Sequence, residues 1–117
     1  MKDSDARPLK LLFVCSRNFR RSLTAERLFD GVTGYEARSA GTQPGARVAL
    51  TAGLIGWADM IFFMERSHLN RARERFGEEL QESTCHVLNI PDDYEFMQEE
   101  LVDELRVGLG DWVTLPE

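Results

Sequence analysis

A cysteine and an arginine stand six positions apart in a basic segment of an otherwise acidic chain. The segment from Cys15 to Ser22 reads CSRNFRRS, whereas the 117 residues carry 14 basic and 20 acidic side chains and a formal net charge of −6. A cysteine thiolate is a nucleophile, and an arginine guanidinium grips two oxyanion oxygens at once. Cys15 and Arg21 therefore predict chemistry on a small anionic group such as a phosphoryl group, with Ser22 able to donate a hydrogen bond to the thiolate.

The spacing by itself is a weak signal, because arginine fills roughly one position in ten of this chain. The segment contains neither GxxxxGK(S/T) nor GxGxxG, so it is not one of the common nucleotide-binding loops. A buried structural cysteine beside a solvated cluster of charges is the alternative interpretation. If the loop does bind phosphate, the candidate binding residues are Ser16, Arg17, Asn18, Phe19, Arg20, Arg21 and Ser22.

Strand and helix patterns alternate along the chain around this segment. Apolar runs predict four strands, at Leu9–Val14, Tyr35–Ala40, Met60–Met64 and Cys85–Ile90. Helical spacing predicts helices at Ser22–Asp30 with Ser22 as N-cap, Val48–Trp57, His68–Phe76 between a Ser67 cap and Gly77, and Gln98–Val107. This alternation predicts an α/β fold of three layers, a four-stranded parallel sheet with helices on both faces and a phosphate-binding loop after the first strand. Such sheets bind ligands at the carboxyl ends of their strands.

Length and composition predict one domain over residues 1–117, with residues 1–8 flexible. The apolar runs are too short to span a bilayer, and residues 1–10 lack the apolar segment of a secretory signal. Two cysteines cannot form a disulfide framework, so a reducing, cytoplasmic location is expected. The acidic balance argues against a nucleic-acid partner, and no membrane partner is expected. The sequence leaves the oligomeric state open.

The stretch from Leu11 to Glu26, LLFVCSRNFRRSLTAE, resembles the active-site signature of the low-molecular-weight protein tyrosine phosphatases. That signature is an apolar strand followed by V-C-x-G-N-x-C-R-S-P-x-A-E. Three further segments of the chain resemble segments of the family and come in the same order. They are Ser39–Thr42 (SAGT), Ala58–Glu65 (ADMIFFME) and Ile90–Tyr94 (IPDDY).

The resemblance implies a phosphatase that forms a phosphocysteine intermediate and requires neither a metal nor another cofactor. Cys15 matches the nucleophile, Arg21 the phosphate-binding arginine and Ser22 the serine that stabilises the thiolate. Asn18 matches an asparagine that shapes the loop, in a left-handed conformation that this residue tolerates. Asp92 matches the general acid that protonates the leaving group and then activates water. The implied substrate is a phosphotyrosine protein, a phosphoarginine or a small phosphomonoester.

Several positions depart from the family pattern. Arg17 replaces a loop glycine, which restricts the backbone and makes the rim of the pocket more positive. Arg20 replaces the second loop cysteine, so the protective disulfide of the family is absent. Asp93 replaces a proline, which leaves open whether Asp92 or Asp93 is the acid; both also fit a turn and helix cap. The segment after Ser39–Thr42 is shorter than in most members.

The remaining candidates have supporting roles or belong to rival functions. Ser39 and Thr42 are expected to hydrogen-bond the loop from behind. Tyr94 and Phe96 fit either the wall of a substrate slot or packing on the last helix. Cys85 would be needed as a resolving cysteine if the protein were an arsenate reductase, although a single strand cysteine is more often a packing residue. A phosphate-binding module without turnover is the non-enzymatic alternative.

Overall fold

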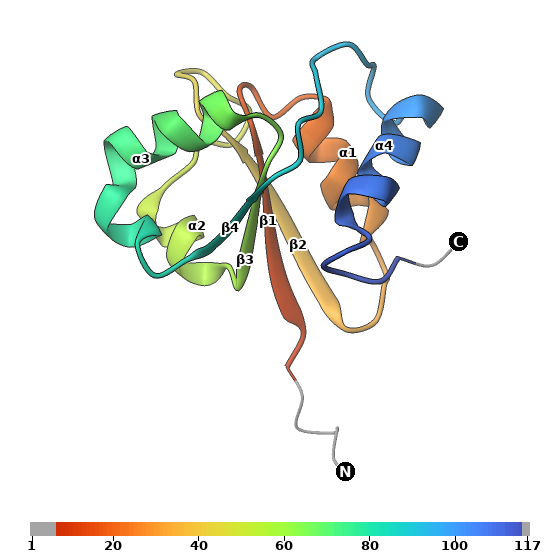
Figure 1. Ribbon diagram of the computed structural model, residues 1–117, viewed down its shortest axis with the longest axis horizontal. Helices are drawn as coiled ribbons and strands as arrows, with labels where there is room; N and C mark the ends of the chain where they lie inside the picture. Colours follow the sequence, from red (N-terminus) through yellow and green to blue (C-terminus); the bar gives the residue numbers. More distant parts are fainter. Residues whose placement is uncertain (1–6, 116–117) are drawn as a thin grey trace.

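The computed structural model describes residues 7–115 and consists of four strands alternating with four helices (Figure 1). The strands are β1 Leu9–Cys15, β2 Tyr35–Gly41, β3 Met60–Phe63 and β4 Thr84–Val87. The helices are α1 Arg21–Leu28, α2 Ala52–Trp57, α3 Arg66–Leu80 and α4 Glu99–Leu109. Residues 1–8 are predicted to be flexible, and positions 1–6 of that segment lie outside the described residues. None of the helices within residues 7–115 is long and apolar enough to cross a membrane.

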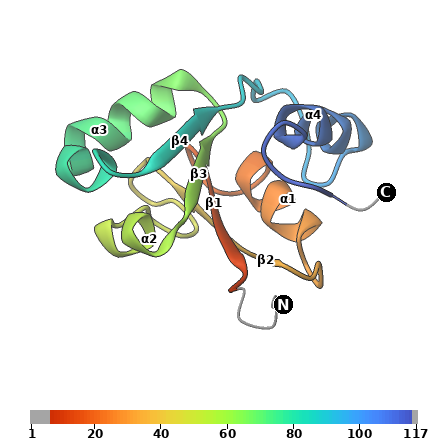
Figure 2. The same ribbon diagram turned by 60° about the horizontal axis from the view of Figure 1, so that its bottom comes forward.

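The four strands form one parallel sheet in the order β2-β1-β3-β4 (Figure 2). The predicted α/β fold with a parallel sheet is therefore confirmed. The second strand pairs on one side of β1 and the third on the other, so the direction of strand order reverses beside β1. The carboxyl end of β1 is thus the switch point, where open parallel sheets bind their ligands.

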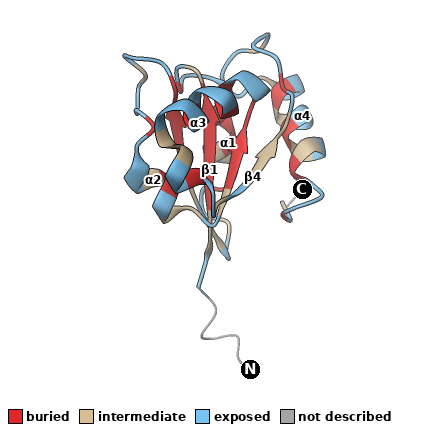
Figure 3. Ribbon diagram, turned by 60° about the vertical axis from the view of Figure 1, so that its left-hand side comes forward, coloured by how far each residue is buried: buried red, intermediate tan, exposed pale blue. Residues whose placement is uncertain are grey.

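The sheet separates two apolar clusters, each covered by a pair of helices (Figures 1 and 3). Alternate side chains of β1 enter opposite clusters: Leu11 and Phe13 pack with α1 and α4, whereas Leu12 and Val14 pack with α2 and α3. All four are fully buried. Burial on both faces explains why the central strand is a continuous apolar run in the sequence.

Two helices differ from their predicted ranges. The second helix begins at Ala52 rather than Val48, because Ala49 pairs in parallel with Gly41, the last residue of β2, through an isolated bridge. The Thr51 side chain then caps the helix by accepting from the Leu54 amide at 3.1 Å.

The predicted end of the third helix, at Phe76 before Gly77, coincides with a kink inside α3 rather than with its last residue. The chain leaves helical geometry at Phe76 (φ −132°, ψ 36°) but resumes it through Leu80. Leu80 is buried in the α2/α3 cluster, so its packing holds a further turn after the kink. The predicted Ser67 cap is wrong as well, because the helix begins at Arg66 and Glu65 forms a capping box with His68.

The ends of other elements shift by a few residues. The helix α1 begins at Arg21, so Ser22 is not its N-cap but its second residue, and no side chain caps it. The strand β4 ends at Val87 rather than Ile90, although the Ile90 amide still donates to the carbonyl oxygen of Met64 at 2.8 Å. The last helix runs from Glu99 to Leu109, with Gln98 at its N-cap.

Candidate active site

The loop between β1 and α1 forms a pocket at the carboxyl edge of the sheet. Cys15 ends the central strand and is buried, and Arg21 opens the helix that follows. The pocket has a volume of about 140 Å³. Its lining consists of Cys15, Ser16, Arg17, Phe19, Arg20, Arg21 and Asp92. Side chains 77 positions apart in the sequence, Cys15 and Asp92, therefore share one small pocket.

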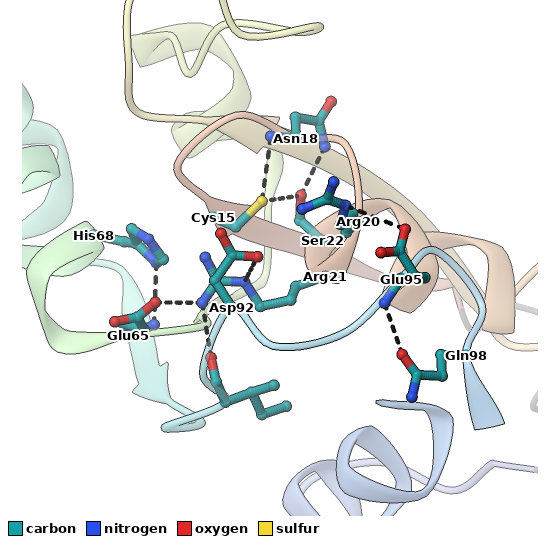
Figure 4. Close-up of polar contacts among 11 residues, drawn as sticks. Cys15, Asn18, Arg20, Arg21, Ser22, Glu65, His68, Asp92, Glu95 and Gln98 are labelled. Atoms are coloured by element: carbon teal, nitrogen blue, oxygen red, sulfur yellow. Dashed lines mark hydrogen bonds and ion pairs between the residues drawn. The ribbon is translucent and has the colours of Figure 1, made fainter. Parts of the chain in front are cut away.

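The sulfur of Cys15 lies among polar partners (Figure 4). Its Sγ is 2.9 Å from Ser22 Oγ and accepts from the Asn18 amide at 3.2 Å. The Asn18 side chain also donates from Nδ2 to Ser22 Oγ at 2.7 Å. Because Ser22 receives this bond, its own hydroxyl proton is available for the sulfur. The Ser22 hydroxyl and the Asn18 amide are therefore both placed to donate hydrogen bonds to Sγ.

The loop holds its shape through one special backbone position and one close approach. Asn18 has φ 65°, a left-handed conformation that asparagine tolerates, as its predicted role requires. Arg17 is not in this region, so its side chain brings no positive-φ strain to the loop. Gly41 packs directly behind the loop, where a Cβ would lie 2.5 Å from the carbonyl oxygen of Ser16. Only glycine fits at that distance.

The segment after β2 supports the loop through its backbone. The amide of Thr42 donates to the carbonyl oxygen of Cys15, that of Gln43 to Ser16 and that of Arg47 to Arg17, each at 3.0 Å. These bonds fix three successive carbonyl groups of the loop. Thr42 therefore supports the loop by its main chain.

Arg21 is buried and held in a fixed orientation (Figure 4). Its Nη1 donates to the Glu65 carboxylate and to the carbonyl oxygen of Ile90, the latter at 2.8 Å. Its Nε lies 3.8 Å from Asp92 Oδ1. The guanidinium is 3% exposed, so two carboxylates balance a cation that has lost nearly all its water. The arginine is thus oriented before any ligand arrives.

His68 stands behind this ion pair. Its Nδ1 accepts from the Glu65 amide at 3.1 Å. Burial, reinforced by the nearby Arg21 cation, lowers the pKa of His68 from 6.5 to about 4, against the smaller opposite effects of Glu65 and Asp92. The imidazole is therefore neutral near pH 7, and it fixes the backbone that presents Glu65 to the arginine.

Neither a scan of protein-family models nor a search of curated proteins gives a match. Solved structures do match most of the chain. The tyrosine phosphatase Wzb from Escherichia coli K30, in complex with phosphate, is 21% identical, with 91% of this chain and 96% of that chain covered and a TM-score of 0.72. The low-molecular-weight protein tyrosine phosphatase SP-PTP from Streptococcus pyogenes is 18% identical, with 89% and 90% covered and a TM-score of 0.72.

A third match is the YwlE arginine phosphatase from Geobacillus stearothermophilus, 22% identical, with 88% and 89% covered and a TM-score of 0.67. The chain has the fold of the low-molecular-weight protein tyrosine phosphatases. The fold expected from the four sequence segments is thereby confirmed.

Within this phosphatase fold, the structure places the remaining candidates at different distances from the pocket. Among residues 7–115 the pocket lining includes Asp92 but not its neighbour Asp93, which is exposed. Tyr94 packs against the α1/α4 cluster, away from the lining. The Ser39 hydroxyl donates to Glu26 on α1, so it bonds the helix after the loop rather than the loop itself.

Two residues beside the pocket were missed at the sequence level, Glu65 and His68. The sequence nevertheless contains a signal for each residue. Glu65 lies in the segment that resembles the family, and His68, whose side chain can form hydrogen bonds, follows it three positions later. That spacing is the pattern of a capping box. The prediction of Ser67 as the helix cap left the capping box of Glu65 and His68 unrecognised.

The second cysteine lies elsewhere. Cys15 belongs to the cluster under α1 and α4, whereas Cys85 packs against the cluster on the opposite face of the sheet. Burial raises the pKa of Cys85. Residues 7–115 also contain no group of three or more His, Cys, Asp or Glu side chains placed to hold a metal ion.

Proposed function

We propose that the protein is a phosphomonoester hydrolase of the protein tyrosine phosphatase type, with Cys15 as nucleophile, Arg21 as phosphate clamp and Asp92 as general acid. One observation carries the proposal: Cys15 Sγ, already contacted by Ser22 and the Asn18 amide, opens into a pocket that Arg21 and Asp92 also line. Nucleophile, cation and carboxyl group are the three parts that phosphoryl transfer through cysteine needs.

In the first step the Cys15 thiolate attacks phosphorus, and the P–O bond to the leaving group breaks. Asp92 donates its proton to the leaving oxygen, so an alcohol or phenol departs. Arg21 neutralises charge on the phosphoryl oxygens, and its anchored Nη1 keeps the guanidinium in place as charge shifts.

In the second step water attacks the phosphocysteine. Asp92, now a carboxylate, takes a proton from this water while the S–P bond breaks and inorganic phosphate forms. The Cys15 thiolate is regenerated and is stabilised again by Ser22 and the Asn18 amide. No redox step and no co-reactant other than water is involved.

The position of Asp92 supports it over Asp93 as the acid. Asp92 lines the pocket and lies 3.8 Å from Arg21 Nε, whereas Asp93 is not among the residues that line the pocket. Because the chemistry needs a reduced nucleophile and both cysteines are free, we also propose a reducing compartment such as the cytoplasm.

The experiment is hydrolysis of p-nitrophenyl phosphate by the wild type and by three variants. Cys15→Ser should abolish turnover. Asp92→Asn should lower kcat by about 10²- to 10⁴-fold, the usual contribution of a general acid. Asp93→Asn is the matched control and should stay close to the wild type.

A folded wild type that binds phosphate or vanadate but does not turn over would contradict the proposal. It would favour the phosphate-binding module instead. A loss in Asp93→Asn with none in Asp92→Asn would exchange the roles of the two aspartates. Arsenate reduction receives no support from the position of Cys85, which lies across the sheet from Cys15.

A further inference from the structure

The pocket above Cys15 is too small to enclose a whole substrate. Its volume of about 140 Å³ lies well below the roughly 300–1,000 Å³ of pockets that bury most of a ligand. A phosphoryl group bound at the sulfur would therefore leave most of its carrier outside, against the rim. The rim consists of Arg17, Phe19 and Arg20, whose side chains are all exposed.

The charge of this rim is opposite to that of the chain. The pocket lining carries three arginines, Arg17, Arg20 and Arg21, but only one carboxylate, Asp92. Arg21 is matched by Glu65 and Asp92, whose side chains are 40% and 53% exposed. Arg17 and Arg20 are the lining arginines outside this group, and they stand at the exposed rim although the protein as a whole has a net charge of −6. Their guanidinium groups favour a second anionic group beside the phosphoryl group.

Arg20 already lies beside a carboxylate of the protein itself (Figure 4). Glu95 Oε1 is 3.8 Å from Arg20 Nε, and the two side chains are 81% and 50% exposed. Exposed pairs of this kind are weak, so a carboxylate from a substrate can take the place of Glu95. The contact shows that a carboxylate fits against this guanidinium.

The surface beside Arg20 also carries apolar side chains. Phe19 is 51% exposed at the loop tip, and Phe96 and Met97 follow Glu95 with comparable exposure. The Met97 amide donates to Thr24 Oγ1 at 2.9 Å, which holds this segment next to α1. Arginines mixed with large apolar side chains are typical of surfaces that bind proteins.

We propose that Arg17 and Arg20 bind carboxylates of acidic residues that flank the phosphorylated side chain of a protein substrate. Phe19 packs against the phosphorylated side chain where it leaves the pocket. This inference rests on the proposed phosphatase function and specifies its substrate class. Two exposed charge pairs raise kcat/KM for an acidic substrate over a neutral one by about five- to tenfold. The preference shrinks as added salt screens the charges.

The test compares two phosphotyrosine peptides of equal length, one flanked by Asp and Glu and the other by Ser and Gly. The quantity measured is the ratio of their kcat/KM values for wild type, Arg17→Ser, Arg20→Ser and the double variant. The ratio should fall about two- to threefold in each single variant and approach one in the double variant. Arg27→Ser is the matched control, because Arg27 is an exposed arginine of α1 outside the pocket lining and pairs with Asp30. It should keep the wild-type ratio.

The failure of this inference differs from the failure of the proposed function. If the wild type hydrolyses both peptides equally well, or if the double variant keeps the preference, the inference is overturned and the phosphatase remains. If the wild type hydrolyses neither peptide nor p-nitrophenyl phosphate, the proposed function fails. In that case, Kd values measured by calorimetry for the same two peptides test whether Arg17 and Arg20 bind acidic flanking residues. Equal affinities would overturn the inference, and tighter binding of the acidic peptide that the double variant loses would support it.

Discussion

His68 should make the stability of the protein depend on pH in a defined window. Its pKa is lowered to about 4 in the folded chain, against 6.5 for an unperturbed histidine. Above pH 6.5 the residue is neutral in both the folded and the unfolded state. As the pH falls from 6.5 toward 4, the unfolded chain binds a proton that the folded chain excludes. The free energy of unfolding therefore decreases through this window.

The size of the effect follows from the two pKa values. The free energy of unfolding falls by about 2 kcal/mol at pH 5 and by at most about 3 kcal/mol below pH 4. Protonated His68 would face the Arg21 guanidinium, and its Nδ1 would no longer accept from the Glu65 amide. Both effects disfavour the folded, protonated form.

The assay is urea unfolding of wild type and His68→Asn from about pH 7.5 to pH 5. Asparagine keeps a hydrogen-bond acceptor near the Glu65 amide but does not titrate. His86 and all carboxylates are present in both proteins, so their titration cancels in the difference. The wild type should be the more stable protein at high pH, and its advantage should shrink by about 2 kcal/mol at pH 5. A difference that stays constant across the window, or an NMR titration of His68 near pH 6.5, would refute the reasoning.

Three further changes test the loop and the core. Ser22→Ala removes a partner of Cys15 Sγ, so kcat for p-nitrophenyl phosphate should fall by about tenfold to a hundredfold and iodoacetamide should alkylate the cysteine more slowly near pH 6. Gly41→Ala forces a Cβ against the loop backbone and should lower the free energy of unfolding by about 1–3 kcal/mol together with phosphate affinity. Leu105→Ala removes a fully buried side chain of α4 and should lower that free energy by about 2–5 kcal/mol, while the exposed Val107→Ala on the same helix should change it by under about 0.5 kcal/mol in urea unfolding.

The parts of the fold that the sequence predicted are those in which local pattern and burial agree. The strands beginning at Leu9 and Met60 are buried on both faces, so continuous apolar runs identified them. The boundaries that were wrong depend on contacts with distant residues. Nothing local shows that Leu80 packs into the α2/α3 cluster and extends a helix beyond Gly77. In the same way, no local pattern shows that Ala49 pairs with Gly41 and that α2 therefore begins only at Ala52.

The candidate site likewise contains residues that the sequence predicted and residues that it did not. Cys15 and Arg21 stood out because their types and spacing are tied to one short loop. The ion pair of Arg21 with Glu65 joins residues 44 positions apart and depends on the order of the strands, which periodicity does not reveal. His68 lies one turn after Glu65, in the first turn of α3. In the sequence it looks like an ordinary helix residue, because only the structure shows that its side chain is buried.

The short connection from β2 to α2 links these observations to substrate choice. Residues 42–47 bond three carbonyl groups of the loop, so the connection is needed to hold the loop in shape. Yet within residues 7–115 no residue of this connection lines the pocket, which is closed only by the loop itself and Asp92. The connection therefore adds no wall to the pocket itself. The proposed selection of substrates then depends on the loop tip and on the segment after Asp92, which together carry Arg20 and Glu95. The charge of the flanking residues, rather than the shape of a deep slot, becomes the property that such a site can distinguish.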